Sequence, residues 1–213
     1  MVRPVLHIGN KRYSSWSLRA WLVLRKAGIA FDEAMVPLHG ADLKQRLSAL
    51  SPGHTVPVLE WQGGVFWDSL AIAEWAAEHT PALWPEDRQQ RAMARSAVAK
   101  MHSGFFALRD QCGMDLGRTP KAIGLNEATR ADIAAVQALW NDVASVDGPF
   151  LFGSWTIADA FFTPVADRFR AYDIPLHASA QTYCDALLSD KDFLDWRADA
   201  LLERMPYPGI TDE

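Results

Sequence analysis

The sequence has little of what disulfide-stapled, nucleic-acid-binding or membrane-spanning proteins need. Its 213 residues include two cysteines, Cys112 and Cys184, which are too few for a disulfide scaffold and fit a reducing compartment. The formal net charge of −5 provides no basic footprint for nucleic acid. No apolar run reaches the roughly 18 residues of a membrane span. Strand-like residues 5–8 are followed at once by Gly9 and charge, unlike a signal peptide. We therefore expect a cytoplasmic protein that binds neither nucleic acid nor membranes.

Motifs for metals and nucleotides are missing as well. The six histidines are scattered, without the paired spacing or cysteine partners of a metal site. There is no P-loop and no dinucleotide fingerprint. What the chain does have is 49 % hydrophobic residues with mixed charge, which indicates a folded protein with a full core. Its length allows one large domain or two small ones.

Residues 1–79 have the pattern of a small α/β domain. The order of predicted elements is β-α-β-α-β-β-α, and its first three members imply a parallel strand pair with a right-handed crossover. The last strand pair has the pattern of a hairpin with turn residues Gly63 and Gly64. In chain order, we predict a strand over 5–8, a helix from Ser14 that ends at Gly28, a strand over 31–36, a short helix over 41–50, strands over 56–60 and 65–67, and a helix from Ser69 to about His79.

Residues 80–87 carry two prolines among turn formers and predict a linker between domains. After this linker, residues 88–213 have helical periodicity without strand-like alternation, which predicts an all-helical domain. Thr156 and Asp159 stand three residues apart at the start of one of its helices, which is the spacing of a capping box with a structural role. The predicted helices cover residues 88–111, 127–145, 157–171, 178–188 and 190–204.

Two features of the hairpin and the helix after it point to a binding site. Pro57 stands at the start of a strand, where a missing backbone N–H is tolerated. Asp68 and Ser69 lie where the second hairpin strand meets the next helix. Free N–H groups and the positive end of the helix dipole favour a carboxylate at that place. Asp and Ser are also ordinary capping residues, so a purely structural hairpin and helix is the alternative.

Val56-Pro57, Asp68-Ser69 and the order of the two domains together resemble the cytosolic glutathione transferases. The resemblance implies an α/β thioredoxin-like N-terminal domain followed by an all-α C-terminal domain. It also implies that Pro57 is cis, that the backbone of Val56 pairs with the cysteinyl part of glutathione, and that Asp68 and Ser69 hold the γ-glutamyl end. The Ser69 hydroxyl and N–H suit a carboxylate, and the Asp68 carboxylate suits an ammonium group.

The run SSWSLR, residues 14–19, resembles the serine-type transferases and is closest to zeta-like and tau-like patterns. The resemblance implies that Ser14 stabilises the glutathione thiolate, with Ser15 and Tyr13 as alternatives and helix capping as the structural alternative for the serines. Trp16 stands where the zeta class has a cysteine that takes part in isomerase chemistry, which argues against maleylacetoacetate isomerase activity. We expect Arg19 to be structural and to pair with acids near the site.

Further candidates come from the resemblance and from residue type. His54 and the weaker candidate Lys44 suit the glycyl carboxylate, although a plain loop histidine is the alternative. Cys112 and Cys184 are expected to be core residues, and no cysteine lies at the start of the first helix, which disfavours mixed-disulfide chemistry. A cluster that lines an acceptor site, or alternatively belongs to the core, comprises Met101, His102, Phe105 and Phe106.

We therefore expect a glutathione transferase that joins the glutathione thiolate to a small hydrophobic electrophile, with glutathione as co-substrate. One alternative is a glutathione-dependent isomerase or dehalogenase on the same fold. Another is a non-catalytic binding or regulatory protein. The resemblance also implies a homodimer whose interface is formed by the helix from Ser69 and the long helix from Arg88.

Overall fold

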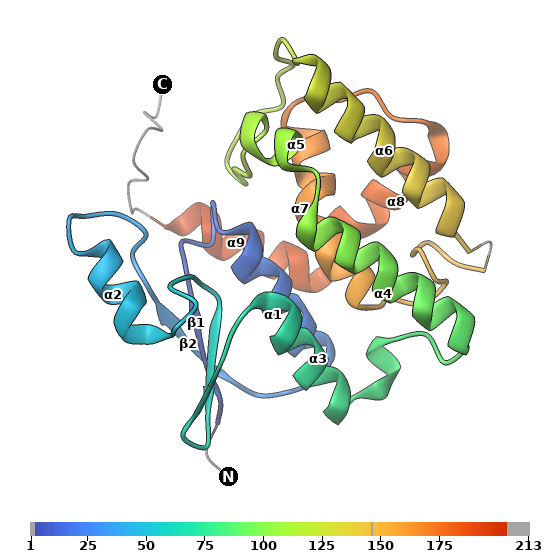
Figure 1. Ribbon diagram of the computed structural model, residues 1–213. Helices are drawn as coiled ribbons and strands as arrows, with labels where there is room; N and C mark the ends of the chain where they lie inside the picture. Colours follow the sequence, from blue (N-terminus) through green and yellow to red (C-terminus); the bar gives the residue numbers. More distant parts are fainter. Residues whose placement is uncertain (1–2, 146, 204–213) are drawn as a thin grey trace.

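The computed structural model describes residues 3–145 and 147–203, and Figure 1 shows a small sheet beside a larger helical part. The α/β pattern predicted for the N-terminal part is confirmed. Its elements are β1 (Val5–Ile8), α1 (Ser15–Lys26), β2 (Asp32–Met35), α2 (Leu43–Leu50), β3 (Val58–Trp61), β4 (Gly64–Phe66) and α3 (Ser69–His79). The fold is thioredoxin-like, as the resemblance implies.

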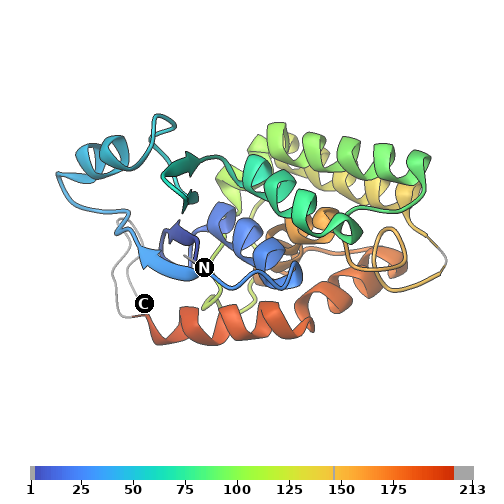
Figure 2. The same cartoon turned by 90° about the horizontal axis from the view of Figure 1, so that it is seen from below.

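The strand order in the sheet is β2-β1-β3-β4. β1 and β2 are parallel, with Val5 opposite Asp32, so α1 is the crossover that the sequence predicts. β3 runs antiparallel to both β1 and β4. Leu6 and Ile8 alternate with more exposed residues along β1 and are fully buried, and α1 and α3 pack together. α2 has no fully buried residue and lies on the far side of the sheet from the helical part (Figures 1 and 2).

The regular elements in the described residues of the C-terminal part are helices, apart from isolated bridges near residues 150–154, and loops connect them. After a 3₁₀ turn, Pro81–Leu83, its helices are α4 (Arg88–Ser103), α5 (Phe106–Gln111), α6 (Glu127–Val143), α7 (Ile157–Ala171), α8 (Ala178–Leu188) and α9 (Lys191–Leu202). α7 is buried along almost its whole length and packs against α1, α4 and α8. No helix of the described part is both long and apolar enough to span a bilayer.

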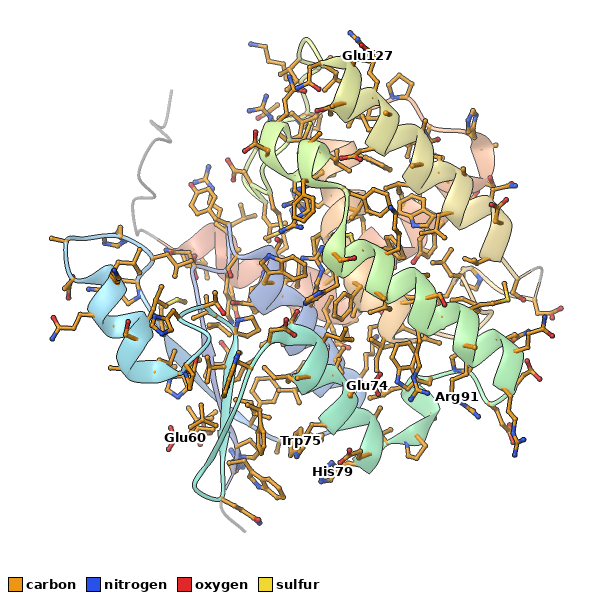
Figure 3. The ribbon with its side chains drawn as sticks, in the orientation of Figure 1. Glu60, Glu74, Trp75, His79, Arg91 and Glu127 are labelled. Carbon is orange, nitrogen blue, oxygen red and sulfur yellow. The ribbon has the colours of Figure 1, made fainter. Side chains whose placement is uncertain are left out.

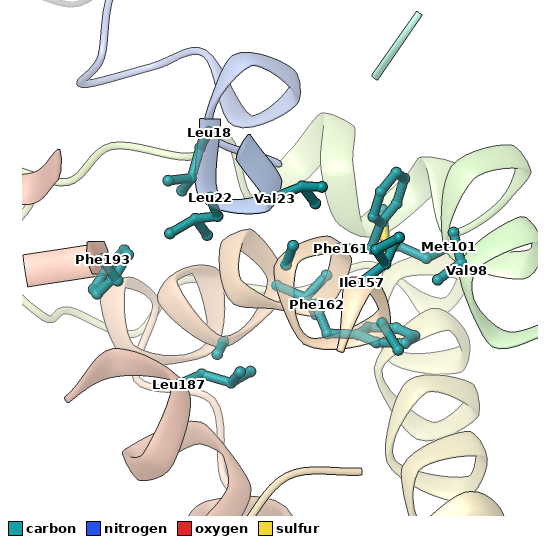
Figure 4. Packing of buried hydrophobic residues seen from close by; sticks show 14 of the residues in the cluster. Leu18, Leu22, Val23, Val98, Met101, Ile157, Phe161, Phe162, Leu187 and Phe193 are labelled. Carbon is teal, nitrogen blue, oxygen red and sulfur yellow. The ribbon is translucent and has the colours of Figure 1, made fainter. Parts of the chain in front are cut away.

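The two parts share one hydrophobic core. Figure 4 shows Phe161 and Phe162 of α7 between Leu22 of α1 and Met101 of α4, and all four side chains are buried. Glu74, labelled on α3 in Figure 3, adds a polar connection, because it accepts hydrogen bonds from Trp84 at 3.2 Å and from Arg95 of α4 at 3.4 Å. The N-terminal part is therefore held in a fixed position against α4 and α7.

The predicted helix over 88–111 is wrong in one respect, because the chain breaks it between α4 and α5. Phe105 has φ 54°, in the left-handed region that interrupts a right-handed helix. Within the hairpin, the turn falls on Gln62 and Gly63, with φ of 50° and 78°, rather than on Gly63 and Gly64. Residue 204, where the last helix is predicted to end, lies outside the described residues. The domain bounds 1–79, 80–87 and 88–213 stay a prediction.

Candidate functional site

Ser14 lies at the N-cap position of α1, in the loop that follows β1. Its side chain makes no cap hydrogen bond to the helix backbone, so the capping alternative does not describe it. Instead the Ser14 hydroxyl donates to Ser17 Oγ at 2.8 Å, and 8 % of Ser14 is exposed. Ser15 is the first helical residue and uses its carbonyl to accept from Arg19. Tyr13 is half-buried beneath Arg12, whose guanidinium lies 5.2 Å from the ring centroid.

The loop that carries Ser14 is held by helix α9, far along the chain. Lys11 Nζ lies 2.7 Å from both Glu33 and Asp199. The Lys11 backbone N–H donates to Glu203 at 2.8 Å, and its carbonyl accepts from the Trp196 indole at 2.9 Å. Burial opposes the charge of Lys11, but the hydrogen bonds with Asp199 and Glu33 outweigh it and raise the pKa. We call this group of contacts the α9 clamp; sequence reasoning missed it.

Asp68 is the N-cap residue of α3. One of its carboxylate oxygens accepts from the Leu70 N–H at 2.8 Å and from the Ala71 N–H at 3.4 Å. The other lies 2.7 Å from His102 Nε2. Ser69 is 1 % exposed, and its Oγ has no hydrogen-bond partner in the structure. The site therefore presents one occupied carboxylate and one unpartnered hydroxyl at a helix N-terminus.

His102 connects the N-terminus of α3 to that of α1. Besides its contact with Asp68, its ring centroid lies 5.2 Å from that of Trp16. Trp16 lies in the first turn of α1, where Ser14 is the N-cap residue, so these two contacts link the starts of the two helices. The Val56-Pro57 peptide bond is cis, as the resemblance implies, and Pro57 is buried just before β3.

Two guanidinium groups lie against the Trp16 indole. Arg19 is 4.2 Å and Arg109 4.7 Å from its centroid. The expectation that Arg19 pairs with acids is wrong: it is fully buried and donates to the carbonyls of Phe161 and Ser15. Burial, together with the charges of Arg168 and Arg109, lowers its pKa well below the ordinary value.

Of the four residues predicted to line an acceptor site, two lie in the hydrophobic core and two lie at least partly at the surface. Met101 and Phe105 are buried in the hydrophobic core, so the expectation that they line a pocket is corrected. Phe106 is 65 % exposed and lies 5.2 Å from the Arg109 guanidinium. Only His102 and Phe106, of the four, have surface to offer a ligand.

The remaining candidates have simpler surroundings. His54 and Lys44 are exposed, and His54 Nδ1 lies 3.0 Å from Ser48 Oγ. Cys112 and Cys184 are buried free thiols, and burial raises the pKa of Cys184 to about 12, which fits a core role. No group of acids, histidines or cysteines within the described ranges could hold a metal ion.

The capping box of α7 is confirmed. The Asp159 carboxylate accepts from the Thr156 N–H at 2.7 Å and from the Thr156 hydroxyl at 3.0 Å. It also accepts from Tyr183 at 2.8 Å and is completely buried. These contacts are structural and lie away from the Ser14 region.

Fold and site together define a two-domain protein with a cis-proline hairpin, an acid-serine pair at the start of α3 and a serine at the start of α1. Residues 13–79 match the family model described as glutathione S-transferase, N-terminal domain. Curated relatives include maleylpyruvate isomerase of Ralstonia sp, 28 % identical over 78 % of this chain and 85 % of that protein. A probable maleylacetoacetate isomerase of Caenorhabditis elegans is 29 % identical over 79 % and 81 %.

Solved structures similar to this chain also include glutathione transferases. A glutathione transferase homologue from Burkholderia gl BGR1, with bound glutathione, has a TM-score of 0.75 at 24 % identity and matches 94 % of this chain and 99 % of its own. The holo structure of maleyl pyruvate isomerase, a bacterial zeta-class transferase, has a TM-score of 0.72 at 25 % identity over 92 % and 97 %. The chain therefore carries a glutathione S-transferase N-terminal domain over residues 13–79 and has the glutathione transferase fold.

Proposed function

We propose that this protein is a glutathione transferase that joins the thiolate of glutathione to a small electrophile. The observation that carries the proposal is the start of α3, where the buried Ser69 hydroxyl has no partner beside the Asp68 carboxylate. His102 and Trp16 link this helix start to that of α1, where Ser14 is the N-cap residue. A non-catalytic binding protein on this fold has no need for this whole set of polar groups, and they argue against that alternative.

The γ-glutamyl end of glutathione fits the start of α3. Its carboxylate supplies the partner that the buried Ser69 hydroxyl lacks, at a helix N-terminus that favours negative charge. Its ammonium group fits the Asp68 oxygen that contacts His102 in the unliganded protein. Binding therefore exchanges an imidazole contact for an ammonium contact at Asp68. His54 and Lys44 remain the candidates for the glycyl carboxylate, and the Val56 backbone for the cysteinyl part.

Ser14 supplies the chemistry at sulfur. A free thiol with a pKa near 8.5 is only a few per cent thiolate at pH 7, and the thiolate is the nucleophile. Lowering that pKa by about two units requires roughly 2.7 kcal/mol. A hydrogen bond from the Ser14 hydroxyl to the thiolate provides roughly 1.5–3 kcal/mol, and the N-terminus of α1 acts in the same direction.

The thiolate then attacks the electrophile. A sulfur–carbon bond forms, and either a leaving group departs with its electron pair or a double bond accepts the pair. We propose that His102, which contacts Trp16, and the exposed Phe106 offer the aromatic and polar surface for the electrophile.

A glutathione-dependent isomerase is the second candidate, and one observation favours it. Arg109 is half-buried beside Trp16, and no carboxylate in the described part of the chain pairs with it. Burial lowers its pKa, and no acid offsets this. A guanidinium without a carboxylate partner suits an acidic acceptor, such as the substrates in the names of the maleylpyruvate and maleylacetoacetate isomerases. Trp16 in place of the zeta-class cysteine still argues against it. A dehalogenase would use the same thiolate.

We also propose a cytoplasmic homodimer that associates through α3 and α4. On α3, the ring of Trp75 lies 4.5 Å from His79 and 5.3 Å from Trp61 of β3, which gives this part of the domain an aromatic surface (Figure 3). Light scattering on the purified protein tests the assembly: twice the 23.7 kDa chain mass is expected, and a monomer would contradict it.

Turnover and binding test the function together. We expect calorimetry to show uptake of reduced glutathione, and turnover with an aromatic halide or a maleyl acid. Ser14→Ala should bind glutathione nearly as tightly while losing most of the turnover. Binding without turnover on either acceptor class would favour the non-catalytic alternative. Full activity in Ser14→Ala, with loss in Ser15→Ala or Tyr13→Phe, would move the thiolate donor to one of those residues.

A further inference from the structure

Ser17 is a completely buried hydroxyl that the mechanism above leaves without a role. It lies in the first turn of α1, three residues after Ser14, so the two side chains share one face of the helix. Its Oγ accepts from the Ser14 hydroxyl at 2.8 Å and from the Gly9 backbone N–H at 3.1 Å. Two donors therefore converge on Ser17 Oγ in this structure.

This arrangement places a condition on Ser14. A serine hydroxyl has one proton to donate, and here Ser14 gives it to Ser17. Donation to a thiolate requires that proton to turn away. Ser17 then rotates its own hydroxyl and donates to Ser14 Oγ, across the same oxygen–oxygen distance, while it still accepts from Gly9. No hydrogen bond is lost in the exchange.

We propose that Ser17 is a positioning residue that holds Ser14 and turns it into a stronger donor when glutathione binds. The hydrogen bonds then run from the Gly9 N–H to Ser17, from Ser17 to Ser14, and from Ser14 to sulfur. Each donor in such a chain is polarised by the one behind it, so the last bond is stronger than it would be alone. No proton leaves its oxygen. This inference rests on the proposed role of Ser14.

Gly9, which follows the end of β1, has a backbone position that allows these successive hydrogen bonds to form. A Cβ atom on Gly9 would lie 2.5 Å from Leu38 Cδ1 and 3.1 Å from Ser14 Cβ. The absence of a side chain is what allows the Gly9 backbone to approach the two serines so closely. The α9 clamp fixes the residues between Gly9 and Ser14 from the other side.

We call the hydrogen bonds from Gly9 through Ser17 and Ser14 to sulfur the serine relay. A double-mutant cycle tests this relay, with the ultraviolet absorbance of the thiolate as readout. The pKa of bound glutathione is measured in wild type, Ser14→Ala, Ser17→Ala and the double variant. We expect Ser17→Ala to raise that pKa by about 0.5, roughly a threefold loss of thiolate at low pH. The double variant should match Ser14→Ala, because Ser17 acts only through Ser14.

The outcomes separate the relay from the proposed function. If Ser14→Ala leaves the thiol pKa unchanged, the role of Ser14 fails. If Ser14→Ala raises it and Ser17→Ala does not, the relay alone is overturned. An equal shift from Ser17→Ala in the presence and absence of Ser14 also overturns it. Ser17→Thr, which keeps the hydroxyl, should stay near wild type, and Ser17→Cys should fall between. These two variants carry the test if Ser17→Ala does not fold. Ser189→Ala, a surface serine that donates to Ala186, is the control.

Discussion

The Ser69 side chain is the single group whose surroundings say most about the ligand. A buried hydroxyl without a partner costs about 1–3 kcal/mol, so a folded protein keeps one only where something compensates. Asp68 next to it is satisfied by two backbone N–H groups and His102. At the residue scale, the Asp68 carboxylate thus has hydrogen-bond partners within the protein, whereas the Ser69 hydroxyl has none.

Ser69→Ala should therefore separate stability from binding. Removal of the unpartnered hydroxyl is expected to raise the free energy of unfolding by up to about 1 kcal/mol. Loss of its bond to the γ-glutamyl carboxylate should raise the Kd for glutathione roughly tenfold or more. Urea unfolding and calorimetry measure the two effects, with Ser189→Ala as a control that should change neither. A variant that is less stable but binds normally would assign Ser69 a purely structural role.

Asp68→Asn isolates the charge of the neighbouring residue. Asparagine caps a helix about as well as aspartate, so stability should change by less than about 0.5 kcal/mol. Glutathione affinity should fall roughly tenfold, because the charge-assisted bond to the ammonium group is lost. Asp68→Ala should lose the same affinity and about 1 kcal/mol of stability in addition. Equal affinity in Asp68→Asn and wild type would show that the ammonium group lies elsewhere.

At the scale of the element, α7 depends on one buried acid. Asp159 accepts hydrogen bonds from Thr156, Tyr183 and Leu151 and connects the start of the helix to its surroundings. Burial raises the pKa of Asp159 from 3.8 to about 6, although these hydrogen bonds oppose the change. The folded protein thus keeps this proton at a pH where the unfolded chain has lost it.

The sign of the resulting pH dependence follows from linkage. Between pH 4 and 6 the folded state binds more protons at Asp159 than the unfolded state, so its contribution to stability falls as the pH rises. A shift of this size corresponds to about 3 kcal/mol. We expect the wild-type advantage over Asp159→Asn in urea unfolding to shrink by about that amount from pH 4 to pH 7. An advantage that stays constant or grows would contradict it; Asp195→Asn on α9 is the control.

At the scale of the whole molecule, the α9 clamp connects the last described helix to the loop that carries Ser14. Figure 2 shows α9 running beneath the helical part toward the sheet. Lys11 is at its centre, between two carboxylates and the rings of Trp21 and Trp196, whose centroids lie 5.7 Å and 5.1 Å from Nζ. The C-terminal part thereby contributes to the position of Ser14, the thiolate donor that we propose, on the N-terminal part.

Lys11→Met should lower both the free energy of unfolding and the rate of turnover. The change removes a largely buried ammonium group and leaves Glu33 and Asp199 without it, so we expect a loss of about 1–3 kcal/mol in unfolding. Turnover should fall several-fold more than glutathione affinity, because Ser14 loses its fixed position. Lys191→Met removes an exposed ion pair on the same helix, 2.6 Å long, and should cost under about 0.5 kcal/mol. Equal effects of the two variants would show that the clamp has no special role.

The sequence allowed the local parts of this account to be predicted. Whereas the cis state of Pro57 followed from the family resemblance, the hairpin, the Asp68-Ser69 helix start and the Thr156 box depend on residues within a few positions of one another. The contacts that complete the site do not. Lys11 and Asp199 are 188 positions apart, and Asp68 and His102 are 34 apart. Local periodicity in a sequence cannot predict contacts between residues so far apart along the chain. The break at Phe105 also escaped, because residues 88–111 contain no proline and a lone glycine, Gly104, does not by itself end a helix.

A crystal structure with reduced glutathione bound tests the central claim most directly. The account predicts that the sulfur lies within hydrogen-bonding distance of Ser14 Oγ, with Ser17 behind that hydroxyl. It also predicts the γ-glutamyl carboxylate on Ser69 Oγ and the ammonium group on Asp68, with His102 displaced. A sulfur atom held by Tyr13 or Ser15, or a tripeptide that leaves Ser69 without a partner, would contradict it.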